Sequence, residues 1–206
     1  ALSERLEDDL DALYDAARIA LDPVGDVPLA RQILERLYRE AARLWEKGAP
    51  ARGERPADQT ALWTHEELVR LATEGGRAQE AVELLTSGAR LPVDPSVSRT
   101  MRRQAGDVAR EQLGDEERAM RLYQSIADES LEDGETVDRL AKMYEARGRI
   151  AELLALRQRE LQQELPPERR LAARLEVARL LGTLEEKGGR VEMLRQNLAD
   201  RPGHEA

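Results

Sequence analysis

The sequence of 206 residues contains no cysteine and no phenylalanine, and aromatic residues make up only 3% of it. Without cysteine the chain can form no disulfide, no thiolate metal site and no cysteine nucleophile, and this composition fits a reducing compartment such as the cytoplasm. The apolar interior must therefore be built mainly from Leu, Ala and Val. That mixture favours helices, because strands are enriched in β-branched and aromatic side chains.

A basic surface and a long apolar run are also missing. The formal net charge is −9, which argues against general attraction to nucleic acid or to an anionic membrane. No apolar run is long enough to span a bilayer, and the first nine residues lack the basic and apolar regions of a signal peptide. We therefore expect neither nucleic-acid binding nor membrane insertion.

Apolar residues recur at three-to-four spacing through almost the whole chain, which predicts an all-α protein of about ten helices and no strand. Asp94 followed by Pro95 predicts the start of one helix, with Asp94 as its N-cap. The breaks at proline and glycine place the helices at about 2–21, 28–47, 60–74, 77–87, 95–113, 115–130, 135–147, 149–164, 168–187 and 190–200.

One segment, residues 48–59, contains two prolines, two glycines and no large apolar residue, and it is expected to be an exposed loop. It would separate an N-terminal hairpin, 1–47, from repeats over 60–206 that are cut from, or continue into, a longer array. Thr64 and Glu67 have the spacing of a capping box, so the helix after the loop begins at Thr64 or a turn earlier. Trp45 and Trp63, which flank the loop, either pack beneath it or form an exposed patch.

Glycines between the predicted helices recur at the length of a helix pair: Gly76 and Gly114 are 38 residues apart, Gly148 follows after 34, and Gly188 after 40. This period is typical of a helical solenoid. Small and aromatic residues recur with it, at Ala119 and Tyr123 on one helix and at Leu140, Ala141 and Tyr144 on the next. The pattern resembles the tetratricopeptide repeat (TPR) family, in irregular helical repeats of bacterial type. The resemblance implies a right-handed α-α superhelix of about five hairpins, in which these five residues set helix packing.

Catalytic and metal-binding motifs are weak. His65-Glu66-Glu67 begins like the helix of a zinc protease but lacks the second histidine four residues on. The carboxylates are dispersed among Arg and Lys, as on solvated helix faces. We therefore expect no catalytic residue, no cofactor and no metal ion, and the chain is not expected to be an enzyme.

The resemblance implies a ligand groove on the concave face, lined by the first helix of each hairpin. The equivalent groove positions are Arg70, Lys142 and Arg179, with Asp138 one turn before Lys142. Three cations could receive acidic side chains or the terminal carboxylate of an extended peptide. Equally, Glu66 and Asp138 lie four residues before Arg70 and Lys142 and could pair with them within the helix.

These observations predict a protein-interaction module that holds a peptide or a helix of a partner protein on its concave face. The alternative is a structural segment that self-associates, forming a homo-oligomer when its terminal helices stack between copies.

Overall fold

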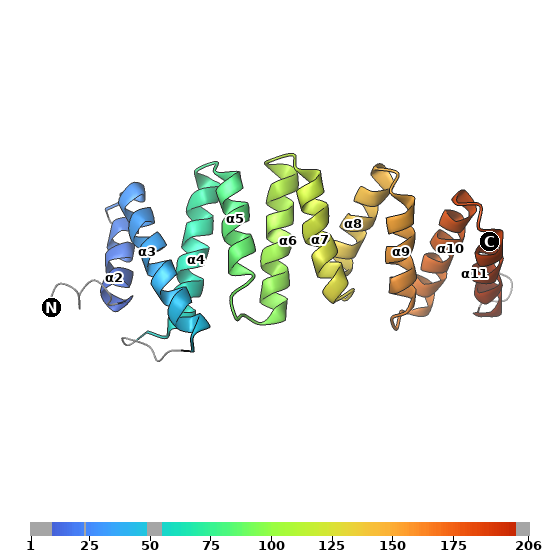
Figure 1. Cartoon of the computed structure of the whole chain (residues 1–206), viewed down its shortest axis with the longest axis horizontal. Helices are drawn as coiled ribbons and strands as arrows, with labels where there is room; N and C mark the ends of the chain where they lie inside the picture. Colours follow the sequence, from blue (N-terminus) through green and yellow to red (C-terminus); the bar gives the residue numbers. More distant parts are fainter. Residues whose placement is uncertain (1–9, 23, 49–54, 201–206) are drawn as a thin grey trace. The chain divides into compact units, whose positions relative to one another are not determined.

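Every regular element in the described part of the chain is an α-helix (Figure 1). The computed structural model describes residues 10–22, 24–48 and 55–200. Its ten helices are α2 (Leu10–Leu21), α3 (Val27–Glu46), α4 (Ala57–Glu74), α5 (Ala78–Gly88), α6 (Pro95–Glu111), α7 (Glu116–Glu129), α8 (Gly134–Ala146), α9 (Ile150–Leu161), α10 (Pro167–Thr183) and α11 (Lys187–Asp200). The predicted all-α class is confirmed.

The chain forms two compact units, Ala1–Leu122 and Tyr123–Ala206, whose boundary falls inside α7. In the first unit α2 packs on α3, α3 on α4, α4 on α5 and α5 on α6; in the second, α8 packs on α9, α9 on α10 and α10 on α11. Helices that pack on their neighbours in sequence are the mark of a repeat protein, in which stability is built from adjacent interfaces. The division into 1–47, 48–59 and 60–206 remains a prediction, and residues 49–54 of its loop lie outside the described residues.

Each of the five helical hairpins turns on one residue with positive φ. Four of these residues are glycines, Gly25, Gly76, Gly114 and Gly148, with φ between 65° and 69°. The residue after each turn donates its N–H to a carbonyl near the end of the preceding helix, as Arg77 does to Ala72 O at 2.8 Å. This bond closes the helix end in a Schellman-type cap.

The fifth turn is not at Gly188, where the sequence predicted it. It falls at Glu185, with φ 63°, and Glu186 N–H donates to Leu181 O at 2.9 Å. Gly188 lies in the first turn of α11 instead. The prediction was wrong because it assumed that glycine marks the turn, whereas a left-handed residue is only usually glycine.

The helix after the predicted loop starts earlier than the capping-box pattern indicated. Helix α4 begins at Ala57, and Thr64 lies inside it, donating its hydroxyl to Thr60 O at 2.6 Å. Ala57 and Ala61 are buried against Leu10 and other apolar residues of α2 and α3. Burial of this alanine face therefore extends the helix about two turns before Thr64, towards the N-terminus, so residues 57–59 are helical.

The residues expected to set helix packing are all buried. Ala119 and Tyr123 of α7 have no exposed surface, and Leu140, Ala141 and Tyr144 of α8 are at most 4% exposed. Helices approach closely where one side presents a small residue. These side chains therefore lie between packed helices, as predicted, in an all-α repeat fold.

The predicted caps and tryptophans can also be located. Asp94 accepts a hydrogen bond from Ser96 N at 2.8 Å and caps α6, as expected. Trp45 and Trp63 are half-buried against one apolar cluster of the first unit, and the ring of Trp63 lies 4.3 Å from that of Tyr14. Both tryptophans therefore help to pack α2, α3 and α4 together.

Candidate functional site

The first helices of the hairpins, α4 and α6 in one unit and α8 and α10 in the other, carry the candidate binding positions. We call the surface that they form within each unit its first-helix face. In the first unit it is formed by Glu66, Val69 and Arg70 of α4 with four residues of α6, namely Val97, Thr100, Met101 and Gln104.

A pocket of about 400 Å³ lies on this face between α4 and α6. Its apolar lining is Val69, Leu85, Val97 and Met101, with Leu85 contributed by α5. Val97 is 39% exposed, so the apolar surface reaches the rim. A concave, largely apolar site with a few polar groups is the usual form of a ligand site in proteins.

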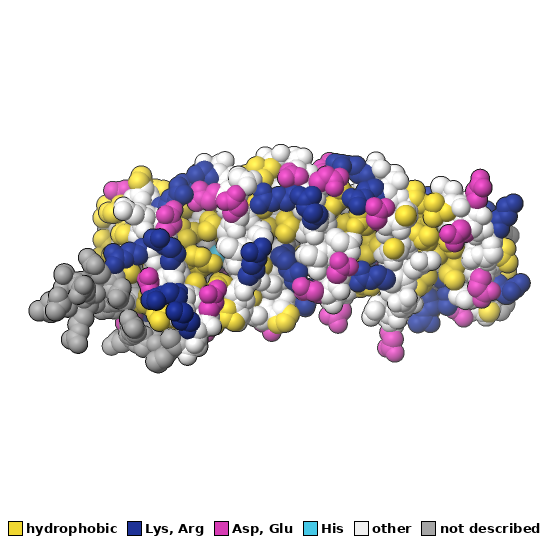
Figure 2. All heavy atoms as spheres, viewed as in Figure 1, with side chains coloured by type: hydrophobic (Ala, Val, Ile, Leu, Met, Phe, Trp, Pro, Cys, Tyr) yellow, Lys and Arg dark blue, Asp and Glu magenta, His cyan; other side chains and the backbone are white. Residues whose placement is uncertain are grey.

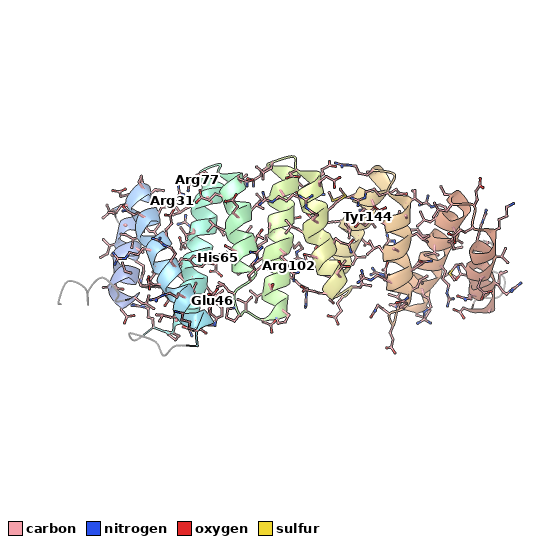
Figure 3. The ribbon with its side chains drawn as sticks, viewed as in Figure 1. Arg31, Glu46, His65, Arg77, Arg102 and Tyr144 are labelled. Carbon is pink, nitrogen blue, oxygen red and sulfur yellow. The ribbon has the colours of Figure 1, made fainter. Side chains whose placement is uncertain are left out.

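His65, a residue of α4 that is labelled in Figure 3, lines the same pocket and is only 2% exposed. Its Nε2 lies 3.0 Å from the carbonyl oxygen of Leu84 on α5. A carbonyl can only accept, so Nε2 carries the proton and Nδ1 is the unprotonated nitrogen. Burial disfavours the charged ring and lowers the pKa of His65, outweighing the hydrogen bond to Leu84 and the nearby Glu66 carboxylate.

The ring of His65 is held from two further sides. The Tyr38 ring of α3 lies 5.9 Å away, and a Cβ added to Gly88 of α5 would lie 2.3 Å from Nε2. Gly88 therefore provides the space that the imidazole occupies. His65 packs three helices together at the base of the pocket and is a neutral residue there.

The charge of Arg70, a predicted binding residue on the rim, is already compensated within α4. Its guanidinium lies 2.6 Å from Glu67 and 2.8 Å from Glu74, and these hydrogen bonds raise the pKa of Arg70. The predicted pairing with Glu66 is wrong, because the side chain is held by acids three residues before it and four after it. Glu66 is exposed and has no ion pair among the described residues.

In the second unit the predicted residues are also largely engaged. Asp138 of α8 pairs with Arg157 of α9 at 3.4 Å rather than with Lys142, so that predicted pair is wrong too. Arg179 of α10 lies 3.0 Å from Glu145 of α8, and both side chains are 57% exposed. Lys142 is exposed and is the one member of the predicted set without an ion pair in the described ranges. Exposed pairs contribute little to stability, so a ligand could displace them.

One pocket on the second unit's first-helix face is bordered mainly by charged side chains. A pocket of about 340 Å³ is bordered by Asp138, Arg157, Glu160, Arg169, Ala172, Ala173 and Glu176. Figure 2 likewise shows basic and acidic side chains interspersed on the face in view, not a continuous basic stripe. The sequence resemblance predicted a row of cations, but within each unit the cations alternate with carboxylates.

Arg157 is the centre of this network and was not singled out from the sequence. Its side chain is 14% exposed, and it donates to Glu160, which is 5% exposed, at 2.8 Å. Its Nε lies 2.9 Å from Glu176, an ion pair without hydrogen-bond alignment. Burial opposes the charge of Arg157, but the bond to Glu160 and the carboxylates of Glu176 and Asp138 outweigh burial and raise its pKa.

Glu160 also joins α9 to the start of α10, because Arg169 donates to it through two nitrogens at 2.7 and 3.0 Å. This arrangement is a structural tie between helices. Nothing in the local sequence distinguishes Glu160 from the solvated acids around it.

In the part of the chain that the structure describes, no three His, Asp or Glu side chains gather closely enough to hold a metal ion. Likewise, none of the described helices combines the length and the apolar character needed to cross a bilayer.

The hairpins define an all-α helical-repeat protein. No family profile and no curated protein matches the sequence. Two solved structures are similar to it: YrrB, described as a TPR protein with an unusual peptide-binding site, and BtubC (BKLC) from P. vanneervenii. The sequence of YrrB is 14% identical to this one, and the two structures superpose with a TM-score of 0.43 over 99% of this chain and 94% of the YrrB chain.

The corresponding values for BtubC are 13% identity and a TM-score of 0.42, with 100% and 94% coverage. Values this low carry no argument about function. The function of this chain is therefore inferred from its own pockets and charges.

Proposed function

We propose that this chain is a non-catalytic interaction scaffold that holds a peptide or helix of a partner protein on its first-helix faces. The observation that carries the proposal is the pocket between α4 and α6, which is apolar inside and reaches solvent through exposed Val97 and Thr100. Arg70, Asp138, Lys142 and Arg179 would contribute contacts around such a ligand. YrrB, with its peptide-binding site, is in keeping with this proposal but does not carry it.

The proposal is tested by selecting binders from a phage-displayed library of random peptides on the whole chain. Thr100 is exposed at the pocket and bonds only to Ser96 O, so Thr100→Trp should fill the pocket and leave the fold intact. The control is Gln79→Trp at an exposed position on the second helix of the hairpin, α5, where the amide donates to Glu83 and accepts from Arg118 of α7, away from the pocket. Peptides selected on the wild type should lose binding to Thr100→Trp and keep it with Gln79→Trp.

If the wild type enriches no peptides, or if both variants bind equally, the first-helix face of the first unit is not the binding surface. Circular dichroism of the two variants should show unchanged helix content, which separates lost binding from lost folding.

A second candidate, self-association, is favoured by the exposed apolar residues of α11. Val191 is 53% exposed and Leu198 49% exposed, and with Leu194 they follow the spacing of one helix face. Light scattering should then show mass rising with concentration, and Val191→Glu with Leu198→Glu should abolish the rise. A strict monomer at high concentration would leave only the interaction scaffold.

A further inference from the structure

The pocket between α4 and α6 constrains the chemistry of what can occupy it. Its interior is formed by Val69, Leu85, Val97 and Met101, and His65 beneath them is neutral. A charged side chain placed there would lose its hydration without gaining a partner. At about 400 Å³ the pocket is at the small end of ligand sites, so it takes one or two side chains rather than a folded surface.

The rim adds a charge preference. Among the described residues, Arg70 is the one cation that lines this pocket, and Glu67 and Glu74 already compensate it at 2.6 and 2.8 Å. Glu66 lines the pocket from the same helix and pairs with none of the described cations. Of the charged side chains that line the pocket, Glu66 is therefore the one whose charge is still open to a ligand.

The opposite rim adds no charged side chain to the lining of the pocket. The residues of α6 that line the pocket are Val97, Thr100, Met101 and Gln104, all uncharged. The arginines of α6, Arg99, Arg102 and Arg103, do not line it. In a chain of net charge −9, the long-range field also favours a basic ligand over an acidic one.

We infer that this pocket selects an extended partner segment in which an aliphatic side chain of Leu, Ile or Met size lies beside a lysine or arginine. The aliphatic side chain enters between Val69 and Met101, and the cation pairs with Glu66. The inference deepens the proposed function and depends on it, since it names the ligand class of the same face. This basic segment is opposite in charge to the acidic ligand that the sequence positions of Arg70, Lys142 and Arg179 suggested.

The test uses the sequences of the selected peptides. Random peptides of about twelve residues span roughly 40 Å when extended, enough to cross α4 and α6. Enriched sequences should combine an aliphatic residue with Lys or Arg within a few positions. One such peptide, made synthetically, should bind Glu66→Gln about two- to fivefold more weakly, the effect of one exposed ion pair.

The matched control is Glu83→Gln, which removes the same charge from the exposed face of α5 and should leave affinity unchanged. High salt should weaken wild-type binding towards the level of Glu66→Gln, because exposed ion pairs are screened. Enrichment of acidic or purely apolar peptides would overturn the inference, as would equal binding to Glu66→Gln and wild type. No enrichment at all would instead count against the proposed function, so the two failures can be told apart.

Discussion

Replacing Gly88 by alanine should destabilise the first unit, although the same change stabilises most helices. Gly88 lies in α5 and is buried. A Cβ at this position would lie 2.3 Å from Nε2 of His65 and 2.8 Å from two ring carbons. The ring cannot simply turn away, because Nε2 is bonded to Leu84 O at 3.0 Å.

The magnitude is set by three opposing effects. Alanine is favoured over glycine in a helix by about 1 kcal/mol. Overpacking a close-packed site costs about 1–3 kcal/mol. If His65 moves, its buried ring N–H loses the hydrogen bond to Leu84 O, and leaving that donor unpaired costs about 1–3 kcal/mol. The net expectation for Gly88→Ala is a loss of about 1–3 kcal/mol in the free energy of unfolding.

Urea unfolding followed by tryptophan fluorescence measures this effect in the right place, because both tryptophans of the chain, Trp45 and Trp63, belong to the first unit. His65→Ala serves as the second arm of a double-mutant cycle. Without the imidazole, Gly88→Ala should be neutral or stabilising by up to about 1 kcal/mol. A destabilisation of equal size in both backgrounds would refute the steric reasoning, and so would a Gly88→Ala protein as stable as the wild type.

Three further changes have definite expected outcomes. The pKa of His65 in the folded protein lies below 6.5, so its contribution to stability is fully present above pH 6.5 and is lost as the pH falls towards the folded-state pKa. The urea midpoint of the wild type should therefore fall with pH over this range, and that of His65→Gln should not show this fall. Glu185→Gly removes a non-glycine residue from a left-handed turn, so it should increase the free energy of unfolding by about 1 kcal/mol and raise the melting temperature. Gly148→Ala makes the opposite change at an equivalent turn and should lower the melting temperature. Glu160→Ala should lower the free energy of unfolding by about 1.5–3 kcal/mol, measured by urea titration with circular dichroism; the loss is limited because Arg157 keeps its ion pair with Glu176. An unchanged urea midpoint would mean that Glu160 does not hold α9 and α10 together.

The fold was predictable because helix spacing and glycine turns are local signals. Apolar residues every three to four positions define each helix, and four of the five turns carry the expected glycine, from Gly25 to Gly148. The two errors in the fold have different causes, tertiary packing for α4 and the conformation of the turn after α10. Burial of Ala57 and Ala61 extends α4, and the cap on α10 accepts Glu185 in a conformation that glycine usually adopts.

The candidate site was less predictable because it depends on which charges meet across helices. Sequence spacing placed Arg70, Asp138, Lys142 and Arg179 on first helices. It could not show that Asp138 would pair with Arg157, nineteen residues away, or Arg179 with Glu145 on another first helix. The role of His65 depends on Leu84 and Gly88, which come close only when α4 packs on α5.

Under the proposed function, the two first-helix faces would contribute different kinds of binding energy. In the second unit a peptide must compete with contacts already made, such as Arg157 with Glu160 and Arg179 with Glu145, so each new ion pair replaces an old one and the net gain is small. In the first unit an aliphatic side chain displaces only water from Val69 and Met101, at about 25 cal/mol per Å² of apolar surface buried. Affinity should accordingly be more sensitive to Thr100→Trp than to Arg179→Ala, even though Arg179 occupies the position that the family pattern assigns to the groove.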